Sequence, residues 1–344
     1  MRHRIGTAIP LMSTQHLSRT EWLEARRRII GSSDAPIIAG VNPYKTPLAL
    51  WNEKVGLVPV DETDPSEASH WGNVLEAVVA KEWAKQTGYK IRRAHAILVN
   101  DQDPWQGANL DFLATTPDGP VILEVKTTAE HNRFRYMDGV PDDHYLQIQH
   151  QLMVTNLDRA IHVILIGGQH LQWSWVDRDR IIQHDLRALE REFFQRVIDR
   201  TPPMDEAMNP QDILIAQGDR TDETVIFDET AARHFQQYAA WSHIKDEAER
   251  ERDVHKAALL KIMGSHKRGR WMDDDGHWWS ITVAQQQRKR IDKDILDQRY
   301  PGWRDQAEMI QVIPQVTIRP PKDSKNDTTN RAAFAPTKQE EVPS

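Results

Sequence analysis

Residues 109–126 read NLDFLATTPDGPVILEVK, and this stretch decides the fold. Val121, Ile122 and Leu123 form a short apolar, β-branched run after a Pro-Asp-Gly turn, a pattern that is typical of a buried strand. The turn at residues 117–119 folds the preceding strand back on it. Side chains alternate along a strand, so Glu124 and Lys126 leave one face while Val125 points into the core.

Acidic and basic groups gather at this hairpin. Asp111 belongs to the preceding strand, so the hairpin can bring one aspartate, one glutamate and one lysine to a single point. Two carboxylates suit a hard cation such as Mg²⁺ or Mn²⁺. A lysine beside them can orient a water molecule and stabilise charge that develops on a phosphate. The plainer alternative is a surface ion pair, because Glu-x-Lys on its own is a common pattern.

Other segments strengthen the functional interpretation. The hairpin resembles the core of the PD-(D/E)XK nucleases, and further motifs resemble one branch of them, the YqaJ-like viral recombinases and phage lambda exonuclease. These motifs occur in the family's order over roughly residues 15–200: WLEARRRIIGSSD (22–34), NPYKTPLALW (42–51), WGNVLE (71–76) and YLQIQHQLMVT (145–155).

The resemblance implies a fold and a set of site residues. The fold would be of the α/β (α+β) class, a central mixed β-sheet flanked by helices. Asp111 and Glu124 would hold Mg²⁺ or Mn²⁺, helped by the backbone carbonyl of Val125. Lys126 would position or activate the attacking water, and two further residues complete the catalytic set: the helical Glu76, and Gln147 near the water or scissile phosphate.

The resemblance also implies a substrate and partners. Family members degrade linear double-stranded DNA from 5′ ends and leave 3′ single strands for a RecT- or Beta-like annealing protein, and a trimeric ring is one assembly found among them. Two alternatives stay open: a RecB-like or restriction-type endonuclease, and a non-catalytic DNA-binding phage protein.

A second constellation predicts how a DNA end is recognised. Arg26 lies near the end of a helix expected to start at a Ser18-x-x-Glu21 capping box and to run to about residue 30. Ser32 or Ser33 is expected to cap the next helix, whose free N–H groups would favour an anion. By resemblance, Arg26 and Ser33 would hold a terminal 5′-phosphate. The alternative is that the arginines only complement the helix C-terminus.

The remaining helices and strands follow from patterns along the chain. A strand is expected at 89–99, a helix at about 70–87 that carries Glu76 on an apolar face, and a helix at 143–156 whose Gln147, His150 and Gln151 by themselves indicate a solvated face. Three regions are predicted: a nuclease domain (1–205), a helical and α+β appendage (206–320) and a disordered tail (321–344).

Composition narrows the function classes. The chain has no cysteine, hence no disulfide framework or zinc–thiolate site, and its net charge of −7 disfavours a DNA coat held by bulk charge. No apolar run approaches the roughly 20 residues that cross a bilayer. No secretory signal is seen at the first residues. These features predict a cytoplasmic protein with no membrane partner, and the resemblance implies a phage or prophage origin.

Overall fold

A computed structural model describes residues 4–58, 67–204, 209–274 and 278–284. Contacts divide the chain into two compact units, Met1–Arg220 and Thr221–Ser344. The predicted tail at 321–344 lies outside the described residues, and the predicted domain boundaries stay a prediction. No helix in the described part is both long and apolar enough to span a membrane.

The first unit is built on a five-stranded mixed sheet. The order across the sheet is β2 (Lys90–Arg92), β5 (Phe112–Thr116), β6 (Gly119–Thr128), β7 (Arg159–Ile166) and β8 (His170–Asp177). All neighbouring strands are antiparallel except β6 and β7, which run parallel. The centre of the sheet is buried on both faces, which explains why β6 and β7 are runs of Val, Ile and Leu rather than alternating patterns.

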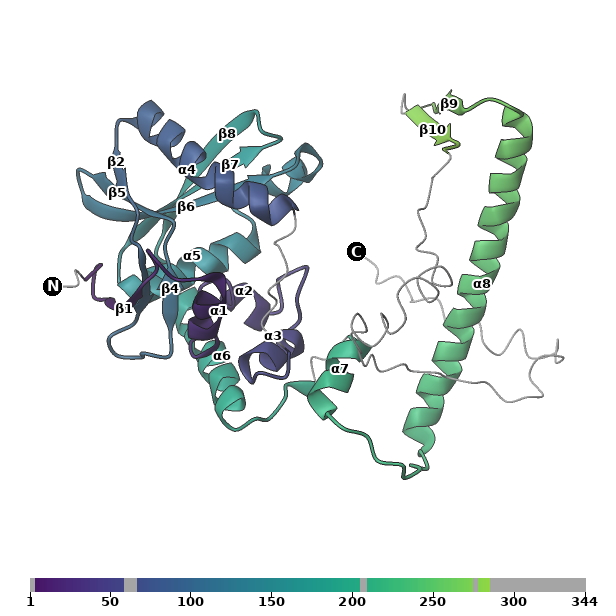
Figure 1. The fold of residues 1–344 in the computed structure, drawn as a ribbon, viewed down its shortest axis with the longest axis horizontal. Helices are drawn as coiled ribbons and strands as arrows, with labels where there is room; N and C mark the ends of the chain where they lie inside the picture. Colours follow the sequence, from purple (N-terminus) through teal and green to yellow (C-terminus); the bar gives the residue numbers. More distant parts are fainter. Residues whose placement is uncertain (1–3, 59–66, 205–208, 275–277, 285–344) are drawn as a thin grey trace, which may run out of the picture. The chain divides into compact units, whose positions relative to one another are not determined.

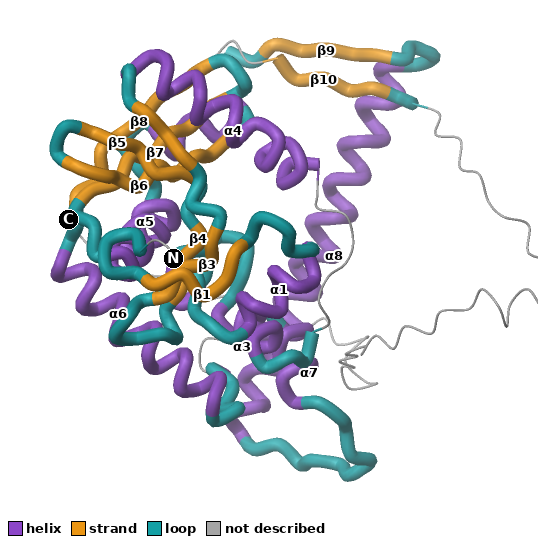
Figure 2. The backbone as a smooth tube through the Cα atoms, turned by 60° about the vertical axis from the view of Figure 1, so that its left-hand side comes forward, coloured by secondary structure: helices purple, strands orange, loops and turns teal. Residues whose placement is uncertain are grey.

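Two helices cover the two faces of this sheet (Figures 1 and 2). Helix α4 (Glu67–Thr87) packs Val79, Ala80 and Trp83 on one face, against Val125 among others. Helix α5 (Asp142–Thr155) packs Ile148 and Leu152 on the other. The predicted class, a central mixed sheet flanked by helices, is confirmed.

Smaller elements surround the α5 side. A three-stranded antiparallel sheet joins β1 (Ile9–Ser13), β3 (Ala96–Val99) and β4 (Gly107–Asn109). The other elements of this unit are α1 (Arg19–Arg27), α2 (Ala35–Ile38), α3 (Pro47–Lys54), the 3₁₀ helix η1 (Glu130–Tyr136), α6 (Arg180–Ile198) and α7 (Pro210–Gln217).

Local caps explain where the first helices begin. Ser18 and Glu21 form the predicted capping box of α1: the Ser18 hydroxyl accepts from the Glu21 N–H, and the Glu21 carboxylate accepts from the Ser18 N–H at 2.9 Å. The Thr46 hydroxyl accepts from the Ala49 N–H at the start of α3, followed by proline at the first helical position. The capping box of α1 depends only on residues three positions apart, and the structure confirms its prediction.

Three expectations about local structure were wrong. The strand expected at 89–99 is two strands, β2 and β3, in different sheets, because the chain turns at His95, whose φ is +48°. Helix α1 ends at Arg27 rather than near residue 30. Neither Ser32 nor Ser33 caps α2: Asp34 is its N-cap residue, and the helix has only four residues. An anion site made by its N-terminal N–H groups is therefore not supported.

The second unit contains one long helix and a hairpin. Helix α8 (Glu229–Met263) begins at Asp228, whose carboxylate accepts from the Thr230 and Ala231 N–H groups. Strands β9 (Arg268–Met272) and β10 (Trp278–Thr282) pair antiparallel.

Candidate functional site

The hairpin β5–β6 brings Asp111, Glu124 and Lys126 together. Asp111 lies one residue before β5 rather than on it, and its Oδ2 accepts a hydrogen bond from the Val125 N–H at 2.9 Å. Glu124 and Lys126 leave the same face of β6, with the Lys126 Nζ 2.6 Å from the Glu124 Oε1. Val125 packs on the opposite face, against the α4 side. The predicted grouping is therefore present in the fold.

Glu124 is the most enclosed group of the site. Its side chain is 1% exposed, and α5 supplies two amide donors to it. The Gln147 Nε2 donates to Oε1 at 2.6 Å and the Gln151 Nε2 donates to Oε2 at 2.7 Å. Every carboxylate oxygen of Glu124 is thus hydrogen-bonded, which offsets the cost of burying the charge.

The solvated face suggested for α5 is a buried one. His150 and Gln151 are 0% exposed, and only Gln147 remains partly exposed. Gln151 is a site residue that sequence reasoning missed. The pattern that could have found it is its spacing: it lies four residues after Gln147, one helical turn along the same face.

Electrostatics reflect the crowding of carboxylates. Burial and the neighbouring charge of Glu124 raise the pKa of Asp111 well above its ordinary value. Burial alone would lower the pKa of Lys126, yet Glu124 and Asp111 raise it above its usual range. Lys126 is therefore a firmly protonated ammonium group in this arrangement.

Glu76 stands apart from the others. It belongs to α4 and forms an ion pair with the Arg93 Nη1 at 2.9 Å, while the Arg93 guanidinium lies 4.5 Å from the centre of the Phe112 ring. Burial raises the pKa of Glu76, Arg93 opposes this, and the charge of Glu124 adds to the rise. Glu76 thus feels the site's charge, but it does not line the cavity that the other four predicted catalytic residues share.

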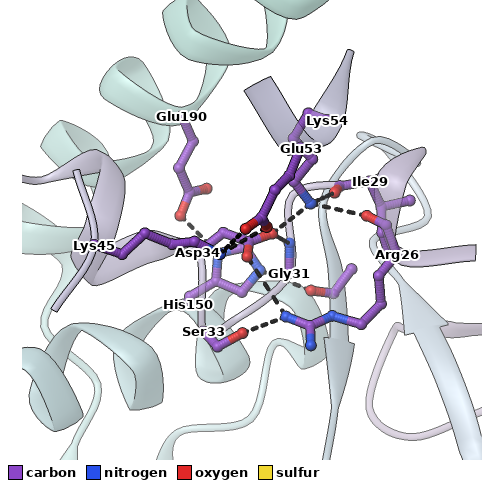
Figure 3. Close-up of polar contacts among 11 residues, drawn as sticks. Arg26, Ile29, Gly31, Ser33, Asp34, Lys45, Glu53, Lys54, His150 and Glu190 are labelled. Atoms are coloured by element: carbon purple, nitrogen blue, oxygen red, sulfur yellow. Dashed lines mark hydrogen bonds and ion pairs between the residues drawn. The ribbon is translucent and has the colours of Figure 1, made fainter. Parts of the chain in front are cut away.

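Arg26 and Ser33 meet in space although they are seven positions apart in the sequence. The Arg26 Nη2 donates to the Ser33 hydroxyl and lies 3.5 Å from the Asp34 Oδ1. The guanidinium also stacks over the Trp22 ring, 4.6 Å from its centroid. Figure 3 shows the arginine and serine side chains pointing toward one another, with Asp34 close to both.

One cavity of about 130 Å³ connects the two predicted constellations. It is lined by Asp111, Glu124, Lys126 and Gln147. Its lining also includes Trp22, Arg26, Ile29 and the Gly31-Ser32-Ser33 turn, together with Ile97 and residues 107–109. A larger open groove of about 570 Å³, beside β8 and the start of α6, contains none of the predicted site residues.

The donor set fits a small divalent cation. In the described residues, no three His, Asp or Glu side chains are arranged as a metal site, so the chain offers two carboxylates, Asp111 and Glu124. Mg²⁺ usually takes one or two carboxylates and keeps waters and substrate phosphates as its other ligands. Two buried oxygens beside Glu124, the Asn109 Oδ1 and the Gln151 Oε1, have no hydrogen-bond donor in the described part.

A pair of histidines packs behind the site and was also missed. The His144 Nδ1 and the His162 Nε2 are 3.0 Å apart, and His162 lies opposite Glu124 in the register of β6 and β7. Burial lowers the pKa of His144 to about 3 and that of His162 to about 4. Both are neutral at pH 7, so one donates and the other accepts.

Comparisons with known proteins agree with the motifs. The model of the "YqaJ-like viral recombinase domain" matches residues 21–158. A curated relative, "Uncharacterized protein YqaJ" of Bacillus subtilis (strain 168), is 36% identical over 235 residues, which are 66% of this chain and 73% of the relative.

Solved structures give weaker likenesses. An alkaline exonuclease (LHK-Exo) from Laribacter hongkongensis has a TM-score of 0.43 at 16% identity, covering 53% of this chain and 93% of the other. A phage related exonuclease from Haemophilus somnus 129PT has a TM-score of 0.37 at 11% identity, covering 52% and 98%. Scores this low carry no functional argument, so the assignment depends on the domain match and the curated relative. On these two findings, the chain belongs to the YqaJ-like viral recombinase family.

Proposed function

We propose that this chain is a metal-dependent deoxyribonuclease that degrades linear double-stranded DNA from its 5′ ends. The observation that carries the proposal is the single cavity whose walls hold Asp111, Glu124 and Lys126 together with Arg26 and Ser33. Membership of the YqaJ-like family supports a phage-type nuclease. The direction of degradation and the end chemistry are part of the proposal.

Asp111, Glu124 and the backbone carbonyl of Val125 would hold Mg²⁺ or Mn²⁺. Such an ion, when bound, supplies Lewis-acid polarisation of a phosphate and a more acidic water. The protein's own contribution is to hold the carboxylates in a fixed orientation. The Gln147 and Gln151 amides do this for Glu124, and the Val125 N–H does it for Asp111.

Lys126 acts through its positive charge. The neighbouring carboxylates hold its pKa above the ordinary value, which disfavours a role as a general base. Its ammonium group can donate to the attacking water and to a phosphate oxygen, where negative charge grows in the transition state. Gln147 is partly exposed in the same cavity and can contact the same water or phosphate.

The test compares DNA forms and metal conditions. We expect Mg²⁺-dependent degradation of linear duplexes, none with chelator, and no cutting of closed circles. Glu124→Gln should slow degradation by at least about 10²-fold, because the oriented anionic ligand is lost. Glu82→Gln, an exposed change on α4, is the matched control. Cutting of closed circles would favour an endonuclease, and DNA binding without any hydrolysis would favour a non-catalytic protein.

Recognition of the end has its own experiment. A guanidinium fork suits a terminal phosphate, which carries more charge than a bridging one. We expect wild type to prefer 5′-phosphorylated over 5′-hydroxyl blunt duplexes, and Arg26→Ala to lose most of that preference. Arg28→Ala, an exposed change two residues away outside the cavity, should keep it. A preference retained in full by Arg26→Ala would place the phosphate elsewhere.

The product would be a 3′ single strand. Such a strand is the substrate of a RecT- or Beta-like annealing protein, which we propose as the partner in recombination. Co-purification of this chain with a RecT- or Beta-like protein, and its loss when that protein is mutated at the interface, would test the partnership. A trimeric ring is likewise a proposal, which sedimentation of the full chain would test.

A further inference from the structure

A buried ion pair lies directly behind the Arg26 pocket. Lys54, the last residue of α3, and Asp34, the N-cap residue of α2, have side chains that are each 5% exposed, and the Lys54 Nζ is 2.6 Å from the Asp34 Oδ2 (Figure 3). A buried pair of this kind costs desolvation on both sides and is weak evidence for stability alone. Its placement therefore calls for another explanation.

The lysine connects the two sides of the Gly31-Ser32-Ser33 turn. Besides Asp34, its ammonium group donates to the Arg26 carbonyl at 2.8 Å and to the Ile29 carbonyl at 2.6 Å. These carbonyls lie at and just beyond the end of α1, where the last carbonyls have no N–H donor within the helix and a cation is favourable. All three ammonium protons have acceptors, so Lys54 fixes where α1 stops relative to where α2 begins.

Asp34 is shared between two cations. Its Oδ2 also accepts from the Gly31 N–H at 2.8 Å, and its Oδ1 is 3.5 Å from the Arg26 Nη2. Burial alone would raise the pKa of Asp34, but Lys54 and Arg26 hold it below the ordinary value, so the carboxylate stays charged. Because Lys54 is the closer cation to Asp34, Arg26 is only loosely paired with this carboxylate.

Arg26, Lys54 and Asp34 together carry one net positive charge beside the cavity. Two cations share one carboxylate, and the cation that is free to respond to a ligand is Arg26. Its guanidinium makes a hydrogen bond with Ser33 and stacks on Trp22, and its side chain is 27% exposed whereas that of Lys54 is 5% exposed.

We propose that Lys54 is a positioning residue for the terminal-phosphate pocket. By pairing with Asp34 and donating hydrogen bonds to carbonyls at the end of α1, it keeps the Arg26 guanidinium available to a 5′-phosphate. This inference rests on the proposed function. Without Lys54, the charged Asp34 keeps Arg26 as its neighbouring cation in the described structure, and the guanidinium is drawn away from the cavity. If Asp34 is also neutralised, that pull disappears.

The charge argument gives a result that a merely structural role would not. Lys54→Met alone should lower the preference for 5′-phosphate, and the double variant Asp34→Asn/Lys54→Met should recover part of it. If Lys54 only supported packing, the double variant should have a lower phosphate preference than Lys54→Met, because it has lost more hydrogen bonds. Lys45→Met, which removes a partly exposed ion pair with Glu53, is the matched control.

The experiment measures degradation of matched blunt duplexes with 5′-phosphate or 5′-hydroxyl ends by the full chain, with a thermal melt for each variant. We expect Lys54→Met to reduce the phosphate preference at least about fivefold, mainly through a higher KM on phosphorylated ends. Lys45→Met should match wild type. The double variant should show a phosphate preference between that of Lys54→Met and that of wild type. If Lys54→Met does not fold, the double variant carries the test, because it must keep a preference that Arg26→Ala lacks.

The outcomes separate the two proposals. A wild type that degrades no DNA, or shows no preference for 5′-phosphate, overturns the proposed function. A wild type that shows the preference while folded Lys54→Met retains it in full overturns the positioning role alone. So does a folded double variant that is no better than Lys54→Met, or, where Lys54→Met cannot be purified, a double variant that behaves like Arg26→Ala.

Discussion

A second buried pair offers a sharp test of the electrostatics of this fold. His150 on α5 and Glu190 on α6 are both fully buried, with the His150 Nδ1 2.6 Å from the Glu190 Oε1 (Figure 3). The Glu190 Oε2 accepts from the Gln106 amide at 2.7 Å, and the His150 Nε2 is 2.9 Å from the Gly107 carbonyl. Since that carbonyl only accepts, the Nε2 must carry a proton.

Two substitutions of Glu190 should differ widely. Glu190→Leu leaves the His150 Nδ1 and the Gln106 amide without their partner, and breaking a buried pair in this way costs about 3–5 kcal/mol. Glu190→Gln can replace both bonds, since its carbonyl accepts from Gln106 and its amide donates to a neutral His150. We expect a cost near 1 kcal/mol or less. For a domain of this size, a gap of about 3 kcal/mol corresponds to roughly 6–12 °C in Tm.

The pair also predicts a pH dependence. Burial opposes the charge on His150, but the carboxylate of Glu190 outweighs it and raises the pKa of His150 above its ordinary 6.5. A raised folded pKa means that the linked stability is fully present below pH 6.5 and is lost as pH rises through the folded value. The advantage of wild type over Glu190→Gln should therefore shrink between pH 6 and pH 9.

Urea unfolding of the three proteins, followed at several pH values, measures both effects. Glu192→Leu and Glu192→Gln are matched controls, because Glu192 is an exposed residue of α6 paired with Arg196, and each should change stability by about 0.5 kcal/mol or less. Equal stability of Glu190→Leu and Glu190→Gln would refute the reasoning, as would a wild-type advantage that grows with pH.

Two further predictions concern protons near the proposed catalytic carboxylates. Because burial and the charge of Glu124 raise the pKa of Asp111, binding of Mg²⁺ or Mn²⁺ should release protons and become stronger as pH rises. Calorimetry in two buffers of different ionisation enthalpy measures this proton release. Binding heats that do not depend on the buffer would contradict it. The pKa of His144 is lowered from 6.5 to about 3 in the folded protein, so between pH 7 and pH 5 this histidine takes up a proton only in the unfolded chain. Wild type should therefore lose about 2 kcal/mol of stability over this range, a loss that His144→Gln should not show. Matching pH profiles of wild type and His144→Gln in urea unfolding would show that His144 is not the titrating group.

Part of this molecule was predictable because it depends on neighbours in sequence. The capping box of Ser18 and Glu21 needs only a spacing of three residues. The common face of Glu124 and Lys126 needs only the two-residue period of a strand, which is why the grouping with Asp111 could be predicted from a turn and an apolar run. The same local logic failed at His95, where one residue with positive φ sends the chain into another sheet.

Only the tertiary structure decided which distant groups share an environment. The amphipathic pattern of α5 could not show that Gln151 is buried, because its partner, Glu124, lies 27 residues away on a strand. Nor could spacing reveal that Lys54 reaches the end of α1, or that Arg26 lines the same cavity as the carboxylates of Asp111 and Glu124. Periodicity fixes which side of an element a residue takes. The partner it meets there depends on how helices and strands far apart in the chain pack to exclude water, and that is a property of the whole fold.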